Sequence, residues 1–240
     1  MAAPQRSQFH RIEALSLATG LTVLAMTLPY SYHLRAFYQR HVAEHPGLKP
    51  PDGVSWSWLT EPIFSDLVVI TMGLILTLPD PRGSGLCIGK IREHWKKLLF
   101  VIGGPMLLIV IVYPQLPDRP FRGADVSMWL TSPLAQDLFF GGVIYRILRP
   151  HFSSRVVSWL PFEWVLPIGG LFFAAWHLQG LDSFPIWYVF FQLLYTWAAY
   201  TFVGLTRQWT GSLLYVTLAH MAGNFIVWFI DHYDVTFHFF

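Results

Sequence analysis

The stretch that decides the fold of this chain reads Thr131-Ser-Pro-Leu-Ala-Gln-Asp-Leu-Phe-Phe-Gly-Gly-Val-Ile-Tyr145. Most of it is apolar, yet a glutamine and an aspartate, Gln136 and Asp137, stand side by side within it. An ionisable side chain at the depth of a bilayer is costly unless it is paired or faces a cavity. The pair therefore indicates a polar site inside an otherwise apolar helix.

The composition of the whole chain is typical of an integral membrane protein. Of its 240 residues, 54% are hydrophobic and 12% are charged, whereas soluble domains carry about 25% charged residues. The single cysteine, Cys87, excludes an internal disulfide framework and a cysteine-rich zinc site. The formal net charge of +2 is small and scattered, so we expect no nucleic-acid partner.

Runs of about 17–25 mostly apolar residues are long enough to cross a bilayer as helices. Seven candidate runs, some of them short, occur at Ile12–Tyr30, Ile63–Leu78, Leu98–Tyr113, Met128–Leu148, Trp164–Leu178, Phe184–Val203 and Gly211–Ile230. No internal repeat is visible. The sequence therefore predicts an all-α fold, a polytopic bundle of about seven transmembrane helices that forms one integral membrane domain over residues 1–240.

Basic residues predict the orientation of this bundle, because cytoplasmic loops carry an excess of lysine and arginine. With seven spans, eleven of the 16 Lys and Arg residues fall on the side of the N-terminus, namely Arg6, Arg11, Arg82, Lys90, Arg92, Lys96, Lys97, Arg146, Arg149, Arg155 and Arg207. We therefore expect a multi-pass protein of the plasma (inner) membrane, with a cytoplasmic N-terminus and an external C-terminus.

The polar pair has the chemistry of a general acid or base. On a helix Gln136 and Asp137 lie about 100° apart, so both can border one cavity. A carboxylate in a low-dielectric pocket can serve as a general base or acid. The alternative is a structural aspartate that bonds a neighbouring helix. Gly141 and Gly142, which follow the pair, are typical of closely packed helices.

Two further polar segments lie downstream in apolar runs, Phe173-Ala-Ala-Trp-His177 and His220-Met-Ala-Gly-Asn224. His220 and Asn224 are four residues apart and share one face of a helix. A histidine can move a proton or bind a metal, and an asparagine can donate a hydrogen bond to a developing oxyanion. Taken alone, His177 would be an interfacial residue at the outward end of its run. The depths of the polar residues allow the three runs to meet around one site.

At these residues the chain resembles the CAAX protease and bacteriocin-processing family of glutamic intramembrane endopeptidases. Its members carry a Glu-Glu-x-x-x-Arg motif, then Phe-x-x-x-His, then His-x-x-x-Asn. The second and third motifs match here, from Phe173 to His177 and from His220 to Asn224, within a family-like core of residues 131–225.

The first motif departs from the family pattern at all three positions, which hold Gln136, Asp137 and Gly141. The resemblance implies a carboxylate that activates water for peptide hydrolysis with the help of the first histidine. The last histidine and the asparagine would stabilise the oxyanion. Because an amide is not a base, Asp137 is the only carboxylate available in the motif.

The implied catalytic set is Asp137, Gln136, His177, His220 and Asn224. The implied partners are the lipid bilayer and a membrane-anchored or lipidated protein substrate, and no cofactor or metal is implied. Three alternatives remain open, and the least favoured is a transporter or proton-relay protein, because no repeat or pair of broken helices supports it. In the other two, the chain is an inactive relative that binds or scaffolds membrane proteins, or it is a zinc peptidase whose two histidines and one carboxylate hold the metal, although it has no His-Glu-x-x-His helix.

Overall fold

The computed structural model describes residues 3–30, 40, 44, 56–112, 127–180 and 186–232. These residues are helical apart from short connections and one isolated bridge between Arg155 and Glu163, which confirms the all-α prediction. The helices are α1 (Ala3–Thr27), α3 (Trp56–Thr77), α4 (Pro81–Ser84), α5 (Ile91–Val112), α7 (Ser132–Gln136), α8 (Tyr145–Phe152), α9 (Val165–Trp176), α10 (Ile186–Thr210) and α11 (Leu214–His232). Short turns of tighter or wider helix accompany them as η1 (Leu28–Tyr30), η3 (Ser127–Thr131), η4 (Asp137–Ile144) and η5 (His177–Gly180).

Over the residues that the structure describes, each apolar run overlaps a helix or a continuous helical stretch. Within the described residues, α10 is the one helix that is long and apolar enough to cross a membrane by length and composition. Shorter apolar helical segments occur at Ile63–Thr77, Val165–Trp176 and Leu214–Val227. The number of membrane crossings therefore stays a prediction.

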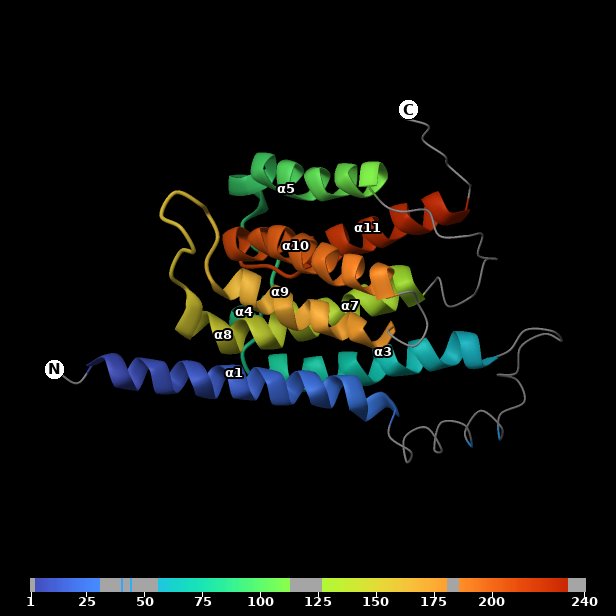
Figure 1. Cartoon of the computed structure of the whole chain (residues 1–240), viewed down its shortest axis with the longest axis horizontal. Coiled ribbons are helices and arrows are strands. Elements are labelled where there is room, and N and C mark those ends of the chain that lie inside the picture. Colours follow the sequence, from blue (N-terminus) through green and yellow to red (C-terminus); the bar gives the residue numbers. More distant parts are fainter. Residues whose placement is uncertain are drawn as a thin grey trace.

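The helices lie side by side with their axes in roughly one direction (Figure 1). Helix α1 packs against α8, α3 packs against α7 and η4, and α9 packs most extensively against α10. On the far side of α10, helix α5 contacts both α10 and α11. Large apolar side chains such as Ile75, Phe100 and Phe190 point outward and are exposed, as is expected of helices that face lipid tails.

The central helical stretch, residues 127–152, consists of η3, α7, η4 and α8 in succession and contains much of the buried core, including Phe139, Phe140 and Ile144. Both η3 and η4 are wound as π-helix. Such winding is rare and is frequent at functional sites. Asp137 is the first residue of η4. The apolar pattern predicted a helix here but not its wider winding.

Arg207 lies inside α10, although the sequence analysis placed it in a loop beyond a span that ended at Val203. Its guanidinium donates to the carbonyl oxygen of Gly83 at 2.7 Å and to that of Gly211, and it lies 5.1 Å from the ring centroid of Tyr145. These contacts replace water around a cation that is only 4% exposed. The helix therefore continues to Thr210 with a buried arginine in its last turn.

The loop after α4 fixes the start of α11. The backbone N–H of Leu213 donates to the carbonyl oxygen of Gly85 at 2.9 Å, and that of Lys90 donates to Thr210 at 3.1 Å. At Gly89 a Cβ atom would lie 2.5 Å from the Thr210 carbonyl oxygen, so only glycine allows this approach. The contact sets the position from which α11 enters the bundle.

A buried carboxylate that the sequence analysis did not single out ties α3 to η3. Asp66 accepts hydrogen bonds from the hydroxyls of Ser127 at 2.7 Å and Thr131 at 2.6 Å. Its position within an apolar run is the sequence feature from which a buried, bonded aspartate could have been predicted. The bonds hold the beginning of the central helical stretch against its neighbour.

We expect the substitution Asp66→Ala to lower the free energy of unfolding by about 1–3 kcal/mol, because two hydroxyls lose their acceptor in the interior. Thermal and denaturant unfolding of the purified protein in detergent measures the change. The control is Glu93→Ala, which removes only an exposed ion pair with Lys90 and should leave stability unchanged. Equal effects of the two substitutions would contradict a structural role for Asp66.

Candidate active site

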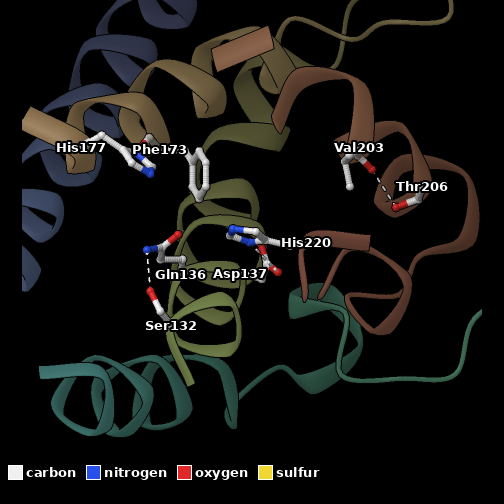
Figure 2. A network of polar contacts seen from close by, with 8 residues as sticks. All are labelled: Ser132, Gln136, Asp137, Phe173, His177, Val203, Thr206 and His220. Atoms are coloured by element: carbon white, nitrogen blue, oxygen red, sulfur yellow. Dashed lines mark hydrogen bonds and ion pairs between the residues drawn. The ribbon is translucent and has the colours of Figure 1, made fainter. Parts of the chain in front are cut away.

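Asp137 and His220 meet at the centre of the bundle. The Nδ1 atom of His220 lies 3.3 Å from each carboxylate oxygen of Asp137. Asp137 comes from the start of η4 and His220 from the middle of α11 (Figure 2). The Asp137 side chain is 1% exposed and that of His220 is 18% exposed. Two polar residues from separate apolar runs are therefore in direct contact, and the catalytic roles implied for them stay a prediction.

The glycine pair after Asp137 lets two neighbours approach the central helical stretch, the residue just before α11 and the last residue of α3. A Cβ atom at Gly141 would lie 2.6 Å from Cδ2 of Leu213, and one at Gly142 would lie 3.1 Å from Cγ2 of Thr77. The predicted role of the pair in close packing is therefore confirmed. Leu213 occupies the space beside position 141, where the resemblance expects an arginine.

Gln136 is buried, and its amide nitrogen donates to the hydroxyl of Ser132 at 2.9 Å. Ser132 lies one turn earlier on the same helix, so this bond ties the amide to its own helix. The sequence analysis did not foresee it, although the spacing of four residues is the usual one for such a contact. The catalytic role implied for Gln136 stays a prediction.

His177 stands at the end of α9, as the sequence predicted, and its Nδ1 atom lies 3.2 Å from the carbonyl oxygen of Phe173. The Phe173 ring makes edge contacts with both histidines, at centroid distances of 5.3 Å to His177 and 5.5 Å to His220. The two histidine rings therefore flank one phenylalanine (Figure 2). Phe173 also stacks on Tyr200 at 4.7 Å.

Asn224 lies one turn beyond His220 on α11 and is half-buried. Its predicted role toward an oxyanion is untested. The zinc alternative required Asp137, His177 and His220 to converge as ligands. Among the described residues, no group of three or more His, Cys, Asp or Glu side chains is placed to hold a metal ion.

A protein-family model described as type II CAAX prenyl endopeptidase Rce1-like matches residues 121–226. The matched segment contains Asp137, His177, His220 and Asn224, so the family resemblance drawn from the second and third motifs is confirmed. These residues form a domain of that family, which comprises membrane proteins. Comparison with curated proteins and with solved structures gave no match.

We expect Gly141→Arg, which restores the family residue, to destabilise the protein by about 1–3 kcal/mol, because the new side chain overpacks the interior. The clash with Leu213 is the cause, so the double substitution Gly141→Arg, Leu213→Ala should recover part of the loss. Thermal unfolding of the two variants beside Leu213→Ala alone measures the coupling. Independent effects of the two substitutions would contradict the packing of α11 described above.

Proposed function

We propose that this chain, which carries an Rce1-like domain over residues 121–226, is an intramembrane endopeptidase that cleaves membrane-anchored or lipidated protein tails. The observation that carries the proposal is the pairing of Asp137 with His220 across 83 positions of the sequence. A carboxylate and an imidazole within hydrogen-bonding distance are groups that hydrolases use to activate water and to move its proton.

Exposed apolar side chains on two helices that carry site residues favour a substrate that comes from the membrane. Leu130 and Leu134 belong to the central helical stretch that carries Asp137, and both are exposed. Leu171, on the neighbouring helix α9, is exposed as well. An apolar or lipidated tail gains free energy by covering such side chains. These features support a substrate whose scissile peptide bond reaches the site from the lipid phase.

A second candidate is an inactive relative that binds membrane proteins without cutting them. It is favoured by the loss of the first motif, since Gln136 is bonded to Ser132 and Leu213 fills the place beside Gly141. In this case the Asp137–His220 contact is a structural link between the central helical stretch and α11. The two candidates differ in whether the contact is needed for cleavage.

We expect the purified protein in lipid nanodiscs to cleave a lipidated or membrane-anchored peptide, and Asp137→Ala and His220→Ala each to lower kcat by about 10²–10⁴-fold. His151→Ala is the matched control, because His151 lies on α8 and contacts His10 instead of the pair. Cleavage products are identified by mass spectrometry. Equal residual cleavage by the native protein and both site variants would favour the second candidate.

The proposed orientation, with a cytoplasmic N-terminus, is testable through the single cysteine of the chain. Cys87 is exposed in the loop between α4 and α5, on the side where basic residues gather. A membrane-impermeant maleimide should label it only after cells are permeabilised. Leu178→Cys in a Cys87→Ser chain places a thiol at the far end of α9 and should be labelled in intact cells. Labelling of Cys87 in intact cells would contradict this orientation and indicate the opposite one.

A further inference from the structure

We propose that His220, and not Asp137, takes the proton from the attacking water. The inference rests on the proposed function. It exchanges two roles that the family resemblance implies, in which the carboxylate activates water and the last histidine stabilises the oxyanion. Asp137 then acts as a positioning residue that holds the imidazole and stabilises its charged form.

The first argument is access. A general base must lie within hydrogen-bond reach of the proton that it removes. The Asp137 carboxylate is almost fully covered, and both of its oxygens face the same nitrogen of His220 at 3.3 Å. The ring of His220 is the more exposed member of the pair. The imidazole is therefore the more accessible of the two groups.

The second argument is the position of the ring proton. A neutral imidazole has one N–H group, and a carboxylate only accepts hydrogen bonds. The contact with Asp137 therefore places the proton of His220 on Nδ1 and leaves a lone pair on Nε2. A neutral ring held in this tautomer can accept a proton from water. It has no second N–H group to donate to an oxyanion.

The third argument separates His220 from His177. The Nδ1 atom of His177 faces the carbonyl oxygen of Phe173, so its Nε2 is an acceptor too. When either ring takes up a proton, the positive charge needs a partner inside the bundle. His220 has the Asp137 carboxylate beside it, whereas His177 has a neutral carbonyl group. The proton therefore goes to His220.

The resulting steps balance. The water oxygen bonds to the scissile carbonyl carbon while one water proton passes to Nε2 of His220, and the carbonyl π pair becomes an oxyanion. The ionised Asp137 stays on Nδ1 of the imidazolium. The C–N bond then breaks as the oxyanion re-forms the carbonyl group, and His220 returns its proton to the departing amine nitrogen. One water is consumed, and a carboxylic acid and an amine are released.

The substitution His220→Gln distinguishes the two roles, because glutamine keeps an N–H donor but is not a base. We expect His220→Gln to lower kcat about 10²–10⁴-fold, as far as His220→Ala. His151→Gln should cleave like the native protein. If His220→Gln keeps kcat within about tenfold of the native value while His220→Ala loses far more, the donor role stands and the base role is overturned.

A second measurement is independent of turnover. Nitrogen-15 NMR of histidine-labelled native protein, with the His220 signals assigned by their loss in His220→Gln, reports which ring nitrogens carry protons. We expect the neutral ring to carry its proton on Nδ1. A proton on Nε2, in a neutral or charged ring, overturns the base role. If the native protein still cleaves the peptide in that case, the proposed function stands. Absence of cleavage by the native protein overturns both.

Discussion

The structure depends on how one carboxylate is accommodated inside an apolar bundle. Asp137 is buried, and an unpaired carboxylate there would be strongly destabilising. The imidazole of His220 is the partner that makes its burial tolerable. For the two to meet, α11 must run close along η4, and the glycine pair at 141 and 142 provides the room. The candidate site and the packing of the bundle therefore rest on the same contact.

The central helical stretch is held by polar contacts on both sides of Asp137. At its beginning, Asp66 on α3 accepts two hydroxyl hydrogen bonds from η3. Beyond Asp137, at the start of α8, Arg146 donates to the carbonyl oxygen of Leu76 at 2.9 Å, and Arg207 lies over the ring of Tyr145. Polar side chains that are bonded inside an apolar bundle act over short distances and in defined directions. They set the rotation of the stretch, which apolar packing alone leaves less well defined.

Much of this arrangement could be predicted from the sequence, and the reasons are physical. The long apolar runs specify helices because backbone polar groups in an apolar medium must bond within the segment. The spacing of His220 and Asn224 specifies one helical face, and the polar residues in three runs indicated a shared site. The π-winding of η4 and the last turns of α10 could not be predicted. They depend on contacts between distant segments, such as Arg207 with the Gly83 carbonyl group, which no local pattern encodes.

The three departures from the family motif are connected through this geometry. Two neighbouring carboxylates and an arginine carry the net charge of one carboxylate, and so do Gln136, Asp137 and Gly141 together. The amide at Gln136 removes a charge that would repel Asp137, and it bonds Ser132 instead. Glycine in place of arginine removes a cation and leaves room for Leu213, the residue just before α11. The carboxylate that remains has no arginine partner within the motif, and its hydrogen-bonding partner in this chain is His220.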